Sequence, residues 1–251
     1  MLSALPGDNL GRRHGAPPAR VVALHGWRRS STDFDAVLVG LDAAAPDLPG
    51  FGAAAPPPAA WGAADYARAV APLCDEGEGG GDGQPVVLVG HSFGGKVAVM
   101  LAAAHPDRVR ALVLTGVPLF VPSGQIAPRP SWRYRAARAL NRMGLVSDER
   151  IEARRRRSGS EDYRAATGVM RDVLVRSVAE TNDGTYRAQL AGIACPVELV
   201  WGEHDTAATP AVAREAATLL PDAHLTVLPD VGHLIPTDAP IALRAAIDRH
   251  L

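Results

Sequence analysis

Short, uninterrupted apolar runs alternate with longer segments of helical periodicity along most of this chain. The apolar runs predict strands at Val21–Leu24, Ala43–Ala45, Val86–Val89, Ala111–Thr115, Val197–Trp201 and Leu225–Leu228. Strands without a polar face are typical of a parallel sheet that helices cover on both faces. The sequence therefore predicts an α/β fold built from strand–helix–strand units.

The segments between these strands predict helices. They are Thr32–Leu41, Asp65–Cys74, Gly95–His105, Pro210–Leu220 and Pro240–Leu251. The alternation stops after Phe120, and residues 121–195 contain no predicted strand. Within them, Ser131–Leu145 and Asp148–Thr181 predict helices, the second interrupted near Ser158–Ser160. A helical insertion of this kind is expected over the carboxyl edge of the sheet, where α/β sheets bind ligands.

One stretch of sequence joins a predicted strand to a predicted helix and carries a serine between glycines. Gly90-His91-Ser92-Phe93-Gly94-Gly95 follows Val86–Val89. This is the G-x-S-x-G pattern in the strand–turn–helix setting that it requires. Its glycines allow a tight turn that strains the serine backbone and lifts the hydroxyl clear of the sheet. The pattern predicts Ser92 as a nucleophile, and a helix start without catalysis is the alternative.

A nucleophilic serine needs a base, and the base needs an acid that holds its tautomer. His233 lies just past the last predicted strand, and Asp205 lies just past Val197–Trp201. We therefore expect Ser92, Asp205 and His233 at one edge of the sheet. Asp230 is a rival acid, but it precedes His233 by only three residues and is better placed to form a turn.

Acyl transfer also needs two backbone N–H donors for the oxyanion. The N–H of Phe93, at the amino end of the predicted helix, is the first expected donor. The N–H of Trp27, in the loop His25-Gly26-Trp27-Arg28 after Val21–Leu24, is the second. Gly26 permits a close backbone approach there. The Trp27 side chain either lines the pocket or packs in the core.

The chain contains the segments LHGW, DLPGFG, LVGHSFGGKVA, ELVWGEHD and VGHLI. As a set they resemble the α/β-hydrolase superfamily, in its lid-bearing, small esterase-like branch. The resemblance implies the α/β-hydrolase fold, a mostly parallel twisted sheet of about seven to eight strands flanked by helices, with a helical lid inserted after the sixth strand. It implies a core of residues 1–120 and 185–251, a lid of residues 121–184, a serine triad and no cofactor. Only 20 residues precede Val21, so we expect one antiparallel edge strand to be short or missing.

The resemblance implies a serine hydrolase that cleaves a carboxylic ester, thioester or lactone through an acyl-Ser92 intermediate. Serine at position 92 excludes the haloalkane dehalogenases and epoxide hydrolases, which need aspartate there. The same triad also serves carbon–carbon bond hydrolysis, acyl transfer and cofactor-free perhydrolysis. The same scaffold also carries weakly catalytic ligand-binding proteins, and fold alone does not decide among these.

Composition and charge limit the partners. A net charge of −1 argues against general binding of nucleic acid. No apolar run reaches the roughly 18 residues of a membrane span. Residues 1–20 lack the apolar stretch of a secretory signal. No cysteine pair has the spacing of a metal site. We expect a cytoplasmic enzyme with a small-molecule, ester-like substrate, no metal and an unpredicted oligomeric state. Residues 121–195 hold 14 arginines against 8 acidic residues, so an anionic substrate remains an alternative. The run Arg154–Arg157 either forms a solvated helix face or contacts such a substrate.

Overall fold

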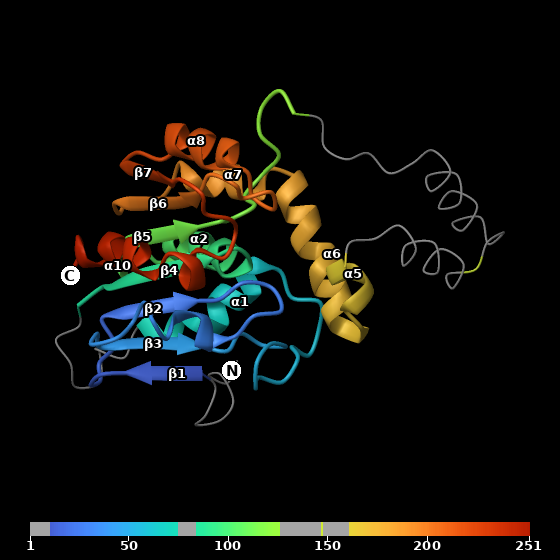
Figure 1. The fold of residues 1–251 in the computed structure, drawn as a ribbon. Helices are drawn as coiled ribbons and strands as arrows, with labels where there is room; N and C mark the ends of the chain where they lie inside the picture. The colour runs from blue at the N-terminus through green and yellow to red at the C-terminus, as the bar shows by residue number, and fades with distance from the viewer. Residues whose placement is uncertain (1–10, 75–83, 126–146, 148–160) are drawn as a thin grey trace.

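Seven strands form one mostly parallel sheet among the residues that the computed structural model describes, which are 11–74, 84–125, 147 and 161–251 (Figure 1). The spatial order is β1-β3-β2-β4-β5-β6-β7. Only β1 runs antiparallel to its neighbour. The strands are β1 (Gly11–His14), β2 (Val21–Leu24), β3 (Ala43–Pro46), β4 (Val86–His91), β5 (Val109–Thr115), β6 (Val197–Gly202) and β7 (Ala223–Leu228).

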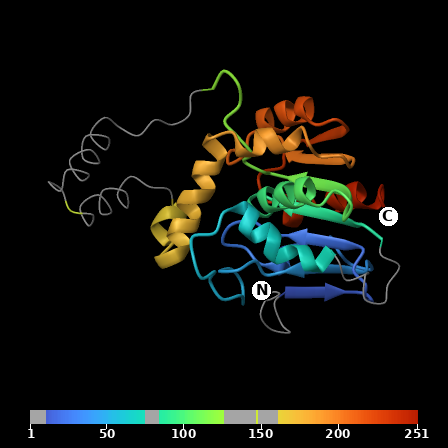
Figure 2. The same cartoon turned by 180° about the vertical axis from the view of Figure 1, so that it is seen from behind.

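Helices cover both faces of this sheet, which Figures 1 and 2 show from opposite sides. On β2, Val22 and Leu24 belong to one apolar cluster, and Val21 and Ala23 belong to another. The first cluster includes side chains of α1 (Ala63–Val70), α2 (Phe93–Ala104), α7 (Thr185–Leu190) and α8 (Pro210–Leu219). The second includes side chains of η1 (Ser31–Phe34), α9 (Ile235–Asp238) and α10 (Pro240–Asp248). Burial on both faces explains why the sequences of these strands are continuous apolar runs.

The predicted strands are all present, and β1 is an addition to them. Its first three residues, Gly-Arg-Arg, are exposed at the sheet edge and His14 is half-buried, so backbone pairing with β3 rather than apolar patterning defines this strand. Charged residues on an edge strand discourage pairing with another chain. β1 is the single antiparallel strand in the described part of the chain. The expectation that an edge strand is short or missing also concerns residues 1–10, which lie outside the described residues.

The helix predicted at Thr32–Leu41 is wrong. Only η1, a single 3-10 turn, forms there, and turns follow it. Phe34, Val37 and Leu38 are buried in the second apolar cluster. Turns, rather than a helix, bury these side chains. One of the turn hydrogen bonds joins Leu38 N–H to the Phe34 carbonyl oxygen at 3.0 Å. The other four helices predicted between the strands are confirmed as α1 with η2 (Ala71–Cys74), α2, α8 and α10.

The insertion begins after β5, the fifth strand of the described chain, and not after a sixth. The prediction placed the insertion after a sixth strand; one strand, β1, precedes β2 in the described residues, and residues 1–10 lie outside them. Two helices of the insertion are described, α5 (Glu161–Ala165) and α6 (Gly168–Asn182). They lie beyond the carboxyl ends of the parallel strands (Figure 1). The predictions at Ser131–Leu145, Ser158–Ser160 and Arg154–Arg157 lie outside the described residues. Within the described ranges, no helix has the length and apolarity needed to cross a membrane.

A buried lysine joins α6 to the core. Lys96, on α2, donates hydrogen bonds to the Ser177 carbonyl oxygen at 3.1 Å, the Ser177 hydroxyl at 3.0 Å and the Thr181 hydroxyl at 2.7 Å. Its Nζ also lies 5.6 Å from the centre of the Tyr186 ring. Burial lowers the pKa of Lys96 to about 8, against a smaller opposing effect of the Glu180 charge. Since only Val173 and Ser177 of α6 are buried, polar contacts carry much of its attachment.

The lysine gives a pH-dependent prediction. Lys96→Met removes the charge and keeps the chain length. Folded protein releases the Lys96 proton near pH 8, whereas an unfolded lysine releases it near 10.5. The unfolded state therefore binds more protons between these values, so the wild type gains stability relative to the variant as pH rises. We expect the difference in unfolding free energy to move by about 1–2 kcal/mol between about pH 8 and 10 in urea titrations. A difference that is constant over this range would contradict the buried charge.

Candidate active site

Ser92 occupies a strained turn between β4 and α2. Its φ of 51° and ψ of −114° are unusual for a residue with a side chain. A Cβ on Gly90 would lie 2.5 Å from Gly95 Cα, and one on Gly94 would lie 2.2 Å from the Leu24 carbonyl oxygen. Both flanking positions therefore require glycine. The predicted strain at Ser92 is present.

The three side chains that the sequence singled out lie in one hydrogen-bonded row. His233 Nε2 is 3.1 Å from Ser92 Oγ, and His233 Nδ1 is 2.8 Å from Asp205 Oδ2. Because a carboxylate only accepts, Nδ1 carries the proton and Nε2 is free to accept from the serine hydroxyl. The Asp205 side chain is fully buried, whereas a quarter of the His233 side chain is exposed.

Backbone amides fix the orientation of Asp205. Its Oδ1 accepts hydrogen bonds from the N–H groups of Ala207 at 2.9 Å and Ala208 at 2.8 Å, which leaves Oδ2 for His233. Sequence reasoning did not identify these two residues, because alanine carries no chemical signal. A carboxylate held by three hydrogen bonds in this way keeps one rotamer.

The loops that carry Asp205 and His233 are joined to each other. Glu203 N–H bonds to the Leu228 carbonyl oxygen, and His204 N–H bonds to that of Val231, each at 2.9 Å. The rival acid Asp230 instead has a left-handed backbone with φ of 58° and lies 3.6 Å from His204 Nε2. Its side chain is 95% exposed. Asp205 is therefore the carboxylate that contacts His233.

His91 is a neighbour of His233 that sequence reasoning missed. Its Nε2 donates to the His233 carbonyl oxygen at 3.0 Å, and the two ring centres are 4.9 Å apart. Burial, with a contribution from the charge of His233, lowers the pKa of His91 to about 4, so it is neutral at physiological pH. Its position inside the G-x-S-x-G pattern was the available signal.

The expected oxyanion donors belong to neighbouring segments. Phe93 is the first residue of α2, where N–H groups have no partner within the helix. The Trp27 ring packs edge-on against the Phe93 ring, with centres 5.5 Å apart. His25 donates through Nδ1 to the Gly26 carbonyl oxygen at 2.8 Å and accepts through Nε2 from Leu48 N–H at 2.9 Å. This buried histidine, whose pKa burial lowers, fixes the loop that leads to Trp27.

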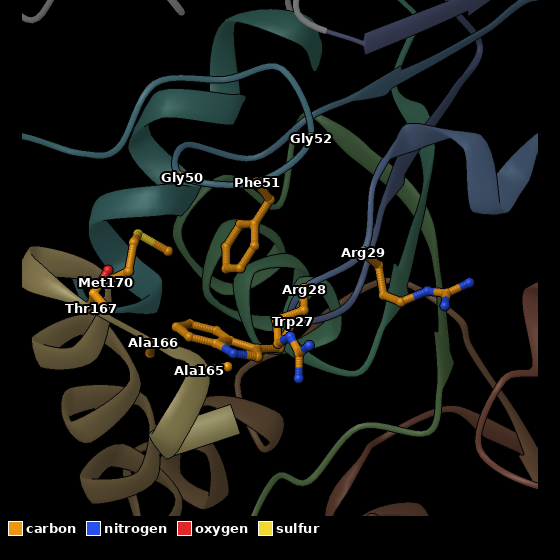
Figure 3. Close-up of a pocket in the computed structure, with 10 residues that line it drawn as sticks. All are labelled: Trp27, Arg28, Arg29, Gly50, Phe51, Gly52, Ala165, Ala166, Thr167 and Met170. Carbon is orange, nitrogen blue, oxygen red and sulfur yellow. The ribbon is translucent and has the colours of Figure 1, made fainter. Parts of the chain in front are cut away.

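A pocket of about 310 Å³ lies beside Trp27 (Figure 3). Two core loops form one wall and the α5–α6 segment forms the other. The lining residues are Trp27, Arg28, Arg29, Gly50, Phe51, Gly52, Ala165, Ala166, Thr167 and Met170. The Trp27 ring also packs against Phe51, with centres 4.9 Å apart. The Trp27 side chain therefore does both things that were predicted as alternatives: it lines the pocket, and it packs against the Phe51 ring.

This arrangement can activate an alcohol oxygen. Ser92, His233 and Asp205 do not themselves line the pocket; Trp27 connects the two, because it lines the pocket and its ring packs against Phe93, the residue after Ser92. His233 is placed to take the Ser92 proton, and Asp205 is placed to stabilise the resulting imidazolium. In the described part of the chain, no group of three or more His, Cys, Asp or Glu side chains could hold a metal ion. The row of Ser92, His233 and Asp205 offers acid–base and nucleophilic chemistry.

Known proteins resemble this chain along most of its length. Residues 21–246 match the family described as "Alpha/beta hydrolase family". A pimeloyl-[acyl-carrier protein] methyl ester esterase of Aromatoleum aromaticum is 31% identical over 240 residues, covering 85% of this chain and 90% of that protein. Lipase LipV of Mycobacterium tuberculosis is 45% identical over 111 residues, covering 41% of this chain and only 39% of the lipase. The solved structure of a hydrolase from Pseudomonas aeruginosa has a TM-score of 0.67 at 23% identity, covering 95% of this chain and 92% of that one, and shows the shared fold.

Gly116 offers a test of the geometry, and it is a second neighbour that the sequence analysis missed. It follows β5 with φ of +58°, and an added Cβ would lie 3.0 Å from His233 Nδ1 and 3.1 Å from Asp205 Oδ2. Gly116→Ala should push this pair apart and slow labelling of Ser92 by a fluorophosphonate at least about tenfold. Gly40 has φ of +73° and nothing within 4 Å of an added Cβ, so Gly40→Ala carries similar backbone strain without the crowding. Equal labelling rates in the two variants would show that the His233–Asp205 contact does not control Ser92.

Proposed function

Because the chain belongs to the alpha/beta hydrolase family, we propose that it is a serine hydrolase that cleaves a carboxylic ester through an acyl-Ser92 intermediate. The observation that carries this proposal is the unbroken row from Ser92 Oγ through the His233 ring to Asp205. A serine hydroxyl is a weak nucleophile, and a hydrogen-bonded histidine removes the proton that limits it.

In the first half of the reaction, Ser92 Oγ bonds to the ester carbonyl carbon as its proton passes to His233 Nε2. The carbonyl oxygen becomes an oxyanion, which the N–H groups of Trp27 and Phe93 stabilise. Collapse of this intermediate breaks the bond to the alcohol oxygen, and His233 returns its proton to the leaving alcohol. Ser92 then carries the acyl group.

The second half uses the same residues. Water loses a proton to His233 Nε2 as its oxygen bonds to the acyl carbon, and the bond to Ser92 Oγ breaks as His233 gives the proton back. Asp205 keeps its negative charge throughout and holds Nδ1–H. The bond from His91 to the His233 carbonyl oxygen and the loop contacts of Glu203 and His204 support the backbone position of His233 in both steps.

The similar proteins and the pocket support the proposed substrate class. The Aromatoleum relative is an esterase of a methyl ester, which supports a carboxylic ester as the substrate of this chain. We propose that residues 121–184 act as the lid over the site and the rest of the chain as the core. Ala166 and Met170 of this segment support that assignment, because they complete the pocket wall.

Removal of the nucleophile tests the function directly. Ser92→Ala should abolish fluorophosphonate labelling and lower the hydrolysis of 4-nitrophenyl acyl esters by at least about 10³-fold. It should not lower the melting temperature, because alanine loses no apolar contact at a strained turn. Ester hydrolysis at the wild-type rate in this variant would remove Ser92 from the mechanism, and labelling of the wild type without turnover would favour a ligand-binding protein.

The two candidate acids provide a matched pair of variants. Asp205→Asn should lower kcat by about 10³–10⁴-fold, because an amide in place of the carboxylate favours the wrong histidine tautomer. Asp230→Asn should stay near the wild-type kcat, since its exposed carboxylate contacts His204 instead. Both changes remove one negative charge and keep the side-chain size. Steady-state kinetics in which Asp230→Asn is the more damaged variant would contradict the assignment.

A further inference from the structure

Arg28 is an unusual residue in the pocket wall. It directly follows the expected oxyanion donor Trp27, and its φ is 56°. The left-handed region disfavours a long side chain in this position, where glycine or asparagine would be relaxed. Backbone strain of this kind concentrates at ligand-binding positions. The strain fixes where the Arg28 side chain leaves the loop, at the edge of the pocket (Figure 3).

The neighbouring arginine shows what a purely structural contact looks like here. Arg29 holds Asp33 through two nitrogens, Nε at 2.7 Å and Nη2 at 2.6 Å, and the Asp33 side chain is only 7% exposed. This pair is bidentate and closed within one loop. The Arg29 charge is therefore already satisfied.

Arg28 is paired in a looser way. A single nitrogen, Nη1, lies 3.2 Å from Glu161 and 3.4 Å from Asp162, both on α5. The Glu161 side chain is 79% exposed and that of Asp162 is 48% exposed. Among the residues that the structure describes, none bonds to Arg28 Nε or Nη2. Long, exposed, single-nitrogen ion pairs contribute little to stability, so a better ligand can replace them.

We propose that Arg28 binds a carboxylate on the substrate ester, and that Glu161 and Asp162 are exchangeable counter-ions that this carboxylate displaces. The inference rests on the proposed esterase function and adds the substrate class, an ester that carries a second, anionic group. A carboxylate that enters the pocket can bond to two nitrogens of the guanidinium in a planar pair. The Trp27, Phe51 and Met170 side chains line the same pocket and offer apolar contacts to the rest of such a substrate.

The pocket dimensions limit the rest of the substrate. A volume of about 310 Å³ is at the small end of ligand pockets. Trp27 and Phe51 form an apolar wall there, whereas Arg28 supplies a positive charge. A short aliphatic chain that separates the scissile carbonyl from the carboxylate satisfies both features. A half-ester of a short dicarboxylic acid is the simplest molecule of this type.

Matched esters test the proposal. Monomethyl glutarate and methyl pentanoate have acyl chains of equal carbon number and differ in the terminal carboxylate; methanol release gives kcat/KM for each. We expect the wild type to prefer the anionic ester, and Arg28→Gln to lower that preference about tenfold. Arg28→Lys, which keeps the charge but not the planar pair, should retain part of it. A second pair, 4-acetoxybutanoate and its methyl ester, places the carboxylate on the alcohol side of the scissile bond. A preference for the anionic ester in either pair supports the proposal. The absence of such a preference in both pairs overturns it.

The counter-ions separate substrate binding from a structural latch. If Glu161 and Asp162 compete with the substrate, the double variant Glu161→Gln/Asp162→Asn should raise the preference for the anionic ester about threefold. Arg28→Gln should move it in the opposite direction. If the ion pair only attaches α5 to the core, both variants remove the same contact and should change the kinetics in the same direction. That result would overturn the proposal.

Equilibrium binding distinguishes failure of this inference from failure of the esterase function. Calorimetry with the Ser92→Ala protein requires no turnover, and it should show tighter binding of monomethyl glutarate than of methyl pentanoate. The difference should disappear when Arg28→Gln is added. Equal binding of both esters, with hydrolysis intact in the wild type, would overturn the anion subsite alone. Arg28-dependent binding without hydrolysis of any ester would overturn the esterase function and keep the subsite.

Discussion

Ser92 N–H donates a hydrogen bond to the Thr115 carbonyl oxygen at 3.0 Å and so extends the pairing of β4 with β5 by one residue. The register of these strands places His91 opposite Thr115, the last residue of β5. Gly116 follows Thr115 directly in the sequence. Because the ladder holds the backbone up to Ser92 and α2 starts at Phe93, the whole change of direction falls on one residue. The same extension brings Gly116 against the His233–Asp205 contact. Strand pairing thus determines both where the serine stands and how its partners approach it.

Backbone groups, rather than side chains, hold most of the site. The amides of Ala207 and Ala208 fix Asp205, the carbonyl oxygen of His233 receives a bond from His91, and that of Gly26 receives one from His25. Backbone partners lose little conformational entropy on ordering, since the sheet and its loops already fix them. Side chains held in this way have their orientations set by backbone that the fold itself positions.

The α5–α6 segment is attached differently from the core helices. Val173 of α6 belongs to the first apolar cluster, but α6 also contacts the core through the buried Lys96 and through Glu180. The Glu180 carboxylate accepts hydrogen bonds from Ala63 N–H and the Tyr186 hydroxyl. Charged and polar attachments respond to pH and ionic strength more than apolar ones do. One wall of the pocket therefore depends on contacts that solution conditions can change, and the other wall belongs to the rigid core.

Local sequence determined the strands, the strained turn at Ser92 and the order of Asp205 and His233, because apolar runs and glycine spacing act over a few residues. It did not determine β1, whose Gly-Arg-Arg-His sequence becomes a strand only by pairing with β3. It overestimated the helix at Thr32–Leu41, because burial of Phe34, Val37 and Leu38 against the sheet needs only turns. The roles of His91, Gly116 and the Ala207–Ala208 amides depend on loops distant in sequence that meet at one sheet edge. Contacts of that kind, and the pairing of Arg28 with α5, come only from tertiary structure, since no local pattern specifies which loops converge.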